Sequence, residues 1–334
     1  MLNRRDVLQK RSNLLQQARA FFYARSVIEV DTPILSQAAT PDVHLASLKS
    51  QVQVPGHKDP KSYYLHTSPE YPMKRLLCEG SGDIFYLGKV FRNGDLSPRH
   101  QIEFSMLEWY RIVFSMHQLI DEVIEFIQTI MLSANSEDNN FKALKVETLS
   151  YQQIFAKYAQ IENVFTASAK DLKDCLVKHQ IPEIVGVDEH DKTLWEQLVL
   201  TEVIEPYLGR DQDNGSITVM YHYPAQDAAL AQVSKDNPQV AERFEVFVNG
   251  MELANGYYEL TDAKLYRQRF NEANIQRQKF GLPVMPLDEN LLNTLEHQGL
   301  PDCSGVALGI DRLFALQQNH SNLKQGICFG IEES

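Results

Sequence analysis

The segment from Phe244 to Leu260 has the pattern of a β-hairpin, and it constrains the fold more than any other part of the chain. Asn249-Gly250 stands between two apolar-rich runs, which is the signal for a two-residue type I′ turn because both central residues need positive φ. Such a turn fixes the register of the two strands, and it places Phe247 opposite Glu252. The sequence therefore predicts an antiparallel hairpin in a largely buried sheet.

Two glutamates of this hairpin are expected to share one face of the sheet. The register places Glu245 opposite Ala254, and period-two alternation then puts Glu245 and Glu252 on the same side. Like charges on one face repel, and a divalent cation between them would remove that cost. Mg²⁺ held by one or two carboxylates and by substrate phosphates is a common arrangement. A solvated sheet face with ordinary surface glutamates is the alternative.

Beyond Glu252, strict alternation turns the polar residues Asn255, Tyr257 and Glu259 away from that face. A β-bulge reverses the phase of a strand because it inserts one extra residue. We therefore predict a bulge at Asn255-Gly256.

Composition and charge narrow the class of protein. The chain has 334 residues, 43% of them hydrophobic and 23% charged, which is typical of a soluble globular protein. A net charge of −12 offers no general attraction to nucleic acid. The four cysteines are far apart, which argues against a zinc site and a disulfide framework. Neither a leader peptide nor a membrane span is expected, so we expect a cytoplasmic protein.

The order of elements predicts an α+β fold, in which helices flank an antiparallel sheet. Expected strands pair with near neighbours in sequence, and no Walker or Gly-x-Gly-x-x-Gly fingerprint is present. Residues 137–213 carry several helical patterns without a chemical cluster, which favours a mainly helical insertion. Helices are also expected at 6–22, 116–131, 262–280 and 288–297, and strands at 84–92, 104–112 and 217–223.

A second group of polar residues lies around the strand that begins at Phe104. Alternation puts Phe104, Glu108 and Tyr110 on one face, and Arg92 ends the neighbouring strand. The planar guanidinium of Arg92 could bind a carboxylate and a phosphate oxygen together, and the loop between these strands adds Arg99 and His100. A core face with one satisfied polar residue is the alternative interpretation.

Two helix starts complete the pattern. Ser68-Pro69-Glu70 has the composition of an N-terminus, with Pro69 at the first helical position. Near the other end of the chain, Gly309 permits close approach of the backbone, and Arg312 falls in the first turn of a helix. A cation is unfavourable there, so an anion such as a triphosphate is the expected partner, with a salt bridge to Asp311 or a neighbour as the alternative.

These segments resemble the class II aminoacyl-tRNA synthetases, with three motifs in the family's order. Val30 to Pro33 is similar to motif 1, which forms the dimer, Arg92 to Phe104 to motif 2, and Gly305 to Arg312 to motif 3. Further segments narrow the resemblance to the lysyl subgroup: 67–70, 104–110 and 252–259. Segments 68–77 and 301–309 most resemble the ligases that attach β-lysine to elongation factor P, which are paralogues of lysyl-tRNA synthetase. The anticodon-binding domain that lysyl-tRNA synthetases carry before motif 1 is missing here.

The resemblance implies a single catalytic domain over residues 1–334, acting as a homodimer. It would use ATP and Mg²⁺ to activate (R)-β-lysine or lysine as an aminoacyl-adenylate, and transfer it to a lysine ε-amine of elongation factor P. Arg92, Arg312, Glu245 and Glu252 would be catalytic, the two glutamates through Mg²⁺. ATP would contact Arg92, Asn93, Gly94, Asp95, Arg99, His100, Gln101, Phe104, Glu252, Leu253, Gly309 and Arg312. The amino acid would contact Ser68, Pro69, Glu70, Glu108, Tyr110, Asn255, Tyr257, Glu259 and Ala307.

Individual roles follow from the same resemblance. Arg92 would bind the amino-acid carboxylate and the α-phosphate, Phe104 would stack on adenine, and Arg312 would bind the γ-phosphate. Glu70 would receive the amine nearer the substrate carboxylate. The distal ammonium would lie among Glu108, Tyr110 and Glu259, with Asn255 and Tyr257 lining the pocket.

The chain departs from the synthetase pattern at three places. Gly94-Asp95 stands where the family has a glutamate that contacts the adenine amino group, Gln101-Ile102 replaces Asn-Pro, and Ala307 replaces glycine, as it does in the ligases. Two alternatives therefore remain, a truncated synthetase that charges tRNA or another amine, and a catalytically silent regulatory paralogue. The acidic charge and the missing anticodon domain argue against tRNA as a partner.

Overall fold

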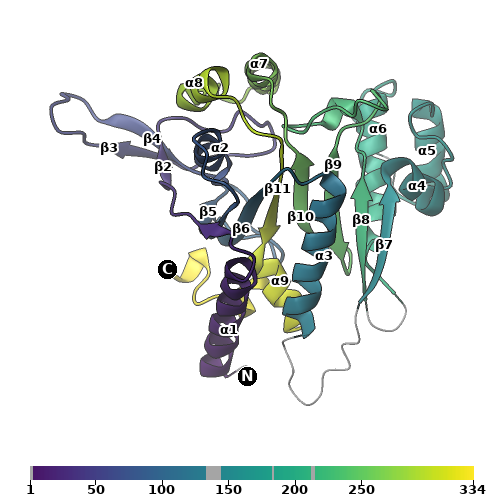
Figure 1. The fold of residues 1–334 in the computed structure, drawn as a ribbon. Coiled ribbons are helices and arrows are strands. Elements are labelled where there is room, and N and C mark those ends of the chain that lie inside the picture. Colours follow the sequence, from purple (N-terminus) through teal and green to yellow (C-terminus); the bar gives the residue numbers. More distant parts are fainter. Residues whose placement is uncertain (1–2, 133–143, 183, 212–214) are drawn as a thin grey trace. The chain divides into compact units, whose positions relative to one another are not determined.

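The computed structural model describes residues 3–132, 144–182, 184–211 and 215–334 (Figure 1). The chain forms two compact units, the first from Met1–Ser115 and Glu259–Ser334 and the second from Met116–Tyr258. Both combine a sheet with covering helices, so the predicted α+β class is confirmed. Within the described residues, no helix is long and apolar enough to cross a membrane.

The sheet of the first unit has its strands in the order β1, β5, β6 and β11. The pairs β5–β6 and β6–β11 are antiparallel as predicted, whereas the two-residue β1 runs parallel to β5. A smaller antiparallel sheet has the order β2, β4, β3. The bounds of these strands are β1 Ile28–Glu29, β2 Leu35–Ser36, β3 Lys49–Val52, β4 Lys61–Leu65, β5 Ile84–Phe91, β6 Glu103–Ile112 and β11 Cys303–Gly309.

Helix α1 (Arg4–Tyr23) covers one face of this sheet with its apolar stripe. The Phe22 ring stacks on Phe85 of β5, with centroids 4.8 Å apart, and meets the edge of Trp109 of β6 at 5.2 Å. Because side chains alternate along β6, burying Trp109 under α1 leaves Glu108 and Tyr110 for the opposite face. The other helices of this unit are α2 (Glu70–Cys78), α7 (Ala263–Lys279), α8 (Glu289–His297) and α9 (Ile310–Gln317).

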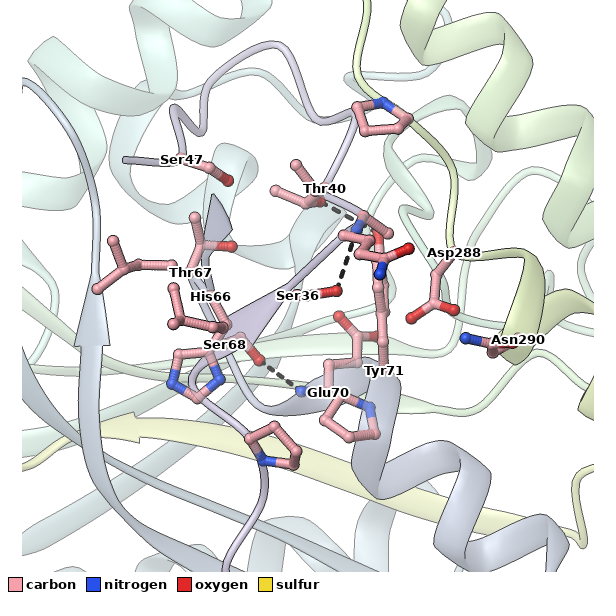
Figure 2. Close-up of a pocket in the computed structure, with 18 of the residues that line it drawn as sticks. Ser36, Thr40, Ser47, His66, Thr67, Ser68, Glu70, Tyr71, Asp288 and Asn290 are labelled. Carbon is pink, nitrogen blue, oxygen red and sulfur yellow. Dashed lines mark hydrogen bonds between the residues drawn. The ribbon is translucent and has the colours of Figure 1, made fainter. Parts of the chain in front are cut away.

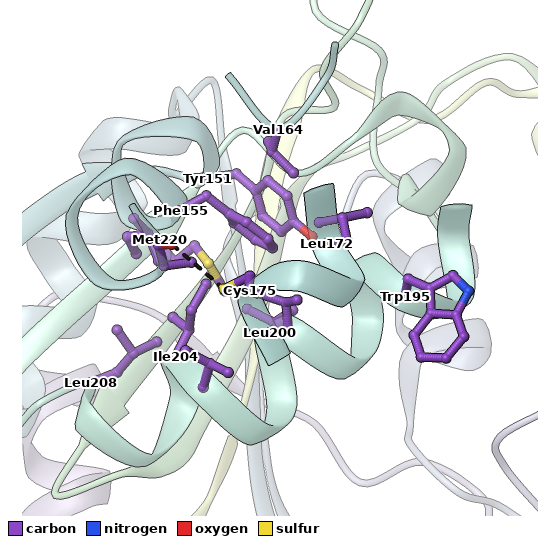
Figure 3. Close-up of a cluster of buried hydrophobic side chains, with 14 of the residues drawn as sticks. Tyr151, Phe155, Val164, Leu172, Cys175, Trp195, Leu200, Ile204, Leu208 and Met220 are labelled. Carbon is purple, nitrogen blue, oxygen red and sulfur yellow. Dashed lines mark hydrogen bonds between the residues drawn. The ribbon is translucent and has the colours of Figure 1, made fainter. Parts of the chain in front are cut away.

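The second unit has the strand order β10 (Met251–Tyr258), β9 (Arg243–Val248), β8, β7. Helix α3 (Met116–Leu132) packs against the hairpin β9–β10. Strand β7 (Lys145–Ser150) runs parallel to β8 (Ser216–Tyr221). The parts of segment 137–213 that are described therefore contain this unpredicted strand besides helices, and residues 137–143, 183 and 212–213 lie outside the description. Helices α4 (Tyr151–Ile154), α5 (Ala169–Lys178) and α6 (Lys192–Val199) bury an apolar cluster on the sheet through Met220 and Phe247 (Figure 3).

The hairpin turn is held by the segment that follows α6. Asn249 and Gly250 both have positive φ, 53° and 68°, as the type I′ turn requires. Their amides donate to the carbonyl oxygens of Gly209 (2.9 Å) and Leu208 (2.7 Å). A Cβ at Gly209 would lie 2.5 Å from the Phe247 carbonyl oxygen, so only glycine allows this close approach.

The bulge predicted in strand β10 (Met251–Tyr258) exists, but its predicted place was wrong. The register against β9 (Arg243–Val248) shifts between Glu252 and Ala254, so Glu245 lies opposite Asn255 and not opposite Ala254. Leu253 and Ala254 are both buried, and a regular strand would turn them to opposite faces. The extra residue at this point still produces the predicted reversal of phase, because Asn255 now shares a face with Glu245.

Candidate active site

The start of α2 brings a hydroxyl to a buried acid. The Ser68 hydroxyl accepts a hydrogen bond from the Glu70 amide (3.0 Å) and donates one to the Glu108 carboxylate (2.6 Å). The helix begins at Glu70, so Pro69 is the residue before it and does not hold the first helical position. Ser68 therefore connects the first turn of α2 to strand β6.

Glu108 is 2% exposed and accepts a second hydrogen bond from the Tyr110 hydroxyl (2.8 Å). Burial, and after it the negative charge of Glu70, raises the pKa of Glu108 to about 8. The two hydroxyls oppose this shift because they favour the ionised form. Glu108 is thus a buried acid whose ionised form is poorly stabilised until a cation arrives.

Lys74, which the sequence patterns did not single out, is fully buried beside these acids. Its ammonium lies 2.6 Å from Glu70 Oε1 and 2.7 Å from Glu259 Oε2, and it donates to the Tyr266 hydroxyl at 3.0 Å. Burial lowers the pKa of Lys74, but the carboxylates of Glu259 and Glu70 outweigh that effect and the net shift is strongly upward. The spacing of four residues from Glu70 was the available signal, and it is also common on helix surfaces.

Strand β11 lies next to the acid cluster, which consists of Glu70, Glu108 and Glu259. Its register places Ala307 opposite Glu108 and Gly305 opposite Tyr110. A Cβ at Gly305 would collide with the Tyr110 ring and lie 2.5 Å from Glu259 Oε1. Glycine at this position therefore makes the space that Tyr110 and Glu259 fill.

A cavity of about 680 Å³ opens at the start of α2 (Figure 2). Ser68 and Glu70 line it, together with residues from the β2 region, from β4 and from the segment before α8. Its volume suits a small-molecule ligand. Sequence patterns missed the contributions of Thr40 and Asp288, which lie in connecting segments without a periodic signal.

The raised pKa of Glu108 makes the stability of the protein depend on pH. The pKa of Glu108 is about 8 in the folded protein and about 4.5 ordinarily, so between these pH values the folded state holds a proton that the unfolded state has lost. The free energy of unfolding therefore falls as the pH rises from 4.5 to 8. Glu108→Gln cannot ionise. We expect its free energy of unfolding, relative to the unchanged protein, to increase by about 1–3 kcal/mol between pH 5 and pH 8. Urea unfolding at both pH values measures this, and an unchanged difference would contradict it.

A second cluster lies where the loop after β5 meets α9. Arg312 donates to His100 Nε2 at 2.7 Å and to the Arg99 carbonyl oxygen at 3.5 Å. Because a guanidinium only donates, His100 Nε2 accepts, and its Nδ1 then donates to the Ser97 hydroxyl (2.8 Å). Three predicted ATP contacts are thus brought together.

Asp311 pairs with Arg11 and not with Arg312, so the part of the alternative that names Asp311 is wrong. The carboxylate of Asp311 binds the Arg11 guanidinium of α1 at 2.6 Å and accepts the Ser105 amide at 2.9 Å. These contacts fix the first turn of α9 against β6. The Arg312 side chain is half-buried, near the positive end of its helix.

The same loop positions further predicted ATP contacts. The Arg92 guanidinium lies over the Phe104 ring, 5.2 Å from its centroid. Gln101 is 2% exposed, and neither of its amide atoms has a hydrogen-bond partner among the residues described. Gly94 has φ of 87°, which explains a glycine where the synthetases have glutamate. A buried amide without a protein partner fits a polar ligand such as a nucleotide base.

In the second unit, Glu245 and Glu252 lie on the same face of the hairpin β9–β10, as predicted. Arg243 lies on that face as well. Arg243 lies 2.6 Å from Glu245 Oε1, and the Asn255 amide donates to the same oxygen at 3.1 Å. Burial and then Glu252 raise the pKa of Glu245. Burial also raises the pKa of Glu205 to about 7, with contributions from Glu245 and Glu252. The carboxylates of Glu205, Glu245 and Glu252 thus repel one another, which fits a cation between them.

Within the described part of the chain, no three histidine, cysteine or acidic side chains are placed to hold a metal together. A cation at Glu245 and Glu252 would need oxygen ligands from a substrate, as Mg²⁺ often takes from phosphates. Neither Arg243 nor Glu205 had been identified from sequence patterns.

Comparison with known proteins agrees with these features. Residues 2–333 match the family model described as tRNA synthetases class II (D, K and N). A Hamiltonella defensa protein named elongation factor P–(R)-β-lysine ligase is 42% identical over 327 residues, covering 98% of this chain and 95% of its own length. Proteins of the same name from Yersinia pestis and Yersinia pseudotuberculosis are 44% identical over 324 residues, covering 97% of this chain and 94% of theirs.

Proposed function

The chain belongs to the class II tRNA synthetase family (D, K and N), and we propose that it is an ATP-dependent ligase that activates (R)-β-lysine and transfers it to a lysine of elongation factor P. The observation that carries the choice of amino acid is the acid cluster around Glu108. A substrate with two ammonium groups offsets the free-energy cost of burying several carboxylates, whereas a substrate with a neutral side chain does not. The names of the relatives agree with this chemistry.

The first step joins the amino-acid carboxylate to ATP. A carboxylate oxygen attacks the α-phosphorus in line, and pyrophosphate leaves to give the aminoacyl-adenylate. Arg92 would bind the carboxylate and the α-phosphate, and Arg312 with His100 would hold the outer phosphates. The reaction needs positioning and neutralised charge, so no nucleophilic side chain is required.

The second step forms an amide bond. The neutral ε-amine of a lysine on the acceptor protein attacks the adenylate carbonyl, AMP leaves, and the ammonium proton is lost to solvent or a base. The relatives' name gives elongation factor P as the acceptor. Such an acceptor brings its amine to the adenylate without the anticodon contacts that a tRNA would need.

Glu245 and Glu252 would hold Mg²⁺ with ATP, which would neutralise phosphate charge. The mutual repulsion of the carboxylates on this face supports the assignment. Glu252→Gln removes one carboxylate, and we expect metal affinity in the presence of ATP to fall by about 10–100-fold. Titration of Mn²⁺ by electron paramagnetic resonance measures this, with Glu162→Gln as a surface control. Unchanged affinity in Glu252→Gln would contradict the assignment.

We also propose that the ligase acts in the cytoplasm, where elongation factors work, and as a homodimer. Ile28 of the edge strand β1 and the nearby Ile34 and Leu35 are exposed apolar residues, as expected of a surface that a partner covers. Sedimentation equilibrium would show a dimer at micromolar concentration. A monomer would contradict this part of the proposal.

The activity is tested by ATP–pyrophosphate exchange with (R)-β-lysine, α-lysine or no amino acid, followed by transfer to either tRNA or elongation factor P. Exchange that depends on β-lysine, with transfer to the protein, is the expected result. Transfer to tRNA alone would favour a truncated synthetase. Absence of exchange with any amino acid would favour a silent paralogue.

A further inference from the structure

The cavity at the start of α2 has no ligand in the chemistry proposed above. Its volume is about 680 Å³, and neither Glu108 nor Glu259 lines it. Glu70 is the one member of the acid cluster that does, together with its neighbour Ser68. The cavity therefore has room for a ligand of its own next to the acid cluster.

Arg75 of α2 lines this cavity with an unpaired guanidinium. Its Nε is buried, and the part of the chain that the structure describes offers the guanidinium neither a hydrogen bond nor an ion pair. A guanidinium donates five N–H groups and accepts nothing, so its partner must supply an oxygen. Its position in a cavity indicates that a ligand brings a carbonyl or carboxylate oxygen.

His66, in the connection between β4 and α2, offers the opposite kind of group. Its Nε2 lies 2.9 Å from the Lys89 carbonyl oxygen, which only accepts, so Nε2 carries the proton and Nδ1 is an acceptor. Burial lowers the pKa of His66, which keeps the ring neutral near pH 7. Nδ1 is buried without a partner among the described residues. His66 is thus an unpaired acceptor in the lining of the same cavity.

One unpaired donor and one unpaired acceptor in a single cavity match a peptide segment. Each peptide group presents both a carbonyl oxygen and an N–H, whereas a phosphate group presents acceptors alone. Arg75 and His66 together therefore suit a polypeptide better than a nucleic-acid backbone.

The charges of the lining favour the same class of ligand. Two of its carboxylates already have cations of the protein, because Glu70 pairs with Lys74 and Glu289 with Arg267. Among the described residues, the Asp288 carboxylate has no cationic partner and accepts only the Leu291 amide, at 2.9 Å. Figure 2 shows Asp288 and His66 on opposite sides of the cavity.

The cavity thus leaves one carboxylate and one guanidinium for a ligand. A lysine-bearing peptide offers a cation for the first and carbonyl oxygens for the second. A polynucleotide brings a negative charge with every phosphate, and the carboxylate would repel it.

The position of the cavity fits a second substrate. Segment 36–47 forms one wall, and the Ala46 carbonyl oxygen in it accepts the amide of Asn93, a proposed ATP contact, at 2.7 Å. Ser68 donates a hydrogen bond to Glu108 and also lines the cavity. The cavity therefore adjoins both the loop assigned to ATP and the acid cluster assigned to β-lysine, where an attacking amine must arrive.

From this arrangement we infer that the cavity binds the lysine-bearing segment of the acceptor protein, whose main-chain carbonyl and N–H groups bind to Arg75 and His66. This inference rests on the proposed function and adds the place where the acceptor binds. Arg75 is a positioning residue, because it holds the segment and does not touch the reacting atoms. The alternatives are a cavity filled with water alone and a cavity that receives the end of a tRNA.

Separate kinetics of the two reaction steps test the inference. Arg75→Gln removes the charge and keeps most of the side-chain length. We expect it to raise the KM for elongation factor P in transfer at least about tenfold, because a hydrogen bond from a charged donor is lost. The KM for β-lysine in pyrophosphate exchange should change less than about twofold. Arg75→Lys restores the charge without the planar fork, so its KM for elongation factor P should lie between the two.

Arg5→Gln is the matched control, because Arg5 is an exposed arginine of α1 that does not line the cavity. It should leave both KM values unchanged, and the melting temperature shows that each variant is folded. An unchanged KM for elongation factor P in Arg75→Gln would overturn the inference. An equal rise in both KM values would also overturn it, because the damage would then lie in the amino-acid site or the fold. Loss of transfer to tRNA alone would assign the cavity to nucleic acid instead.

Deuterium uptake by the amides of the unchanged protein gives a test without a variant. With elongation factor P above its KM for transfer, we expect slower uptake in segments 36–47 and 286–290, which line the cavity. Unchanged uptake in both segments while transfer proceeds would overturn the inference. Absence of transfer to elongation factor P by the unchanged protein would instead overturn the proposed function itself.

Discussion

Arg312→Ala is expected to reduce β-lysine-dependent pyrophosphate exchange by at least about 10²-fold, because it removes a fixed cation from the developing charge on the phosphates. Arg312 donates hydrogen bonds to His100 and to the Arg99 carbonyl oxygen at the start of α9. Asp311 forms an ion pair with Arg11. The contacts of Asp311 with Arg11 and with the Ser105 amide hold the first turn of α9 against β6. We expect KM for ATP to rise and kcat to fall, with little change in melting temperature.

Arg4→Ala provides the control for this variant. Arg4 is an exposed arginine in the first turn of α1, so it shares the position in a helix but lies over Phe329 and not beside the loop of His100. Its exchange activity should equal that of the unchanged protein. Equal activities of Arg312→Ala and the unchanged protein would contradict the assigned phosphate site.

Gly305→Ala is expected to reduce β-lysine activation by about 10²-fold, mainly through KM, because its methyl group would occupy space filled by Tyr110 and Glu259. Both neighbours are buried, so neither can move without disturbing the acid cluster. Overpacking of this kind costs about 1–3 kcal/mol of stability. Steady-state exchange kinetics and urea unfolding measure the two effects separately.

Leu14→Ala separates loss of stability from damage to the pocket. Leu14 is buried in α1, and its truncation costs about 2–5 kcal/mol without touching the acid cluster. Leu14→Ala should be the less stable variant and retain its KM for β-lysine. If Gly305→Ala also retained that KM, the claim that Gly305, Tyr110 and Glu259 border the β-lysine site would be contradicted.

The hairpin shows what the sequence could predict and where it failed. Asn249-Gly250 determines its own backbone, so the turn and the pairing next to it were predicted correctly. The bulge position depends on which side chains the core accepts, and the burial of Leu253 and Ala254 decided it. Period-two alternation contains no information about such a tertiary preference.

The acid cluster shows the same limit in the candidate site. Glu108 and Tyr110 were placed on one face by alternation, and they are hydrogen bonded there. Lys74 was missed because its partners Glu259 and Tyr266 are distant in sequence, and a lysine four residues after a glutamate is usually an exposed pair. Arg243 was missed for a different reason: Glu245 is only two residues away, but the contact of Arg243 with the Asp227 carbonyl oxygen depends on the tertiary structure.

The central claim is that this chain joins β-lysine to a protein, and the intact mass of elongation factor P tests it most directly. Elongation factor P is incubated with the protein, ATP, Mg²⁺ and (R)-β-lysine, with Arg312→Ala in a parallel reaction. A mass increase of one β-lysyl group, absent with Arg312→Ala, is the predicted result. An unchanged mass, while the same protein sample catalyses β-lysine-dependent pyrophosphate exchange, would contradict elongation factor P as the acceptor.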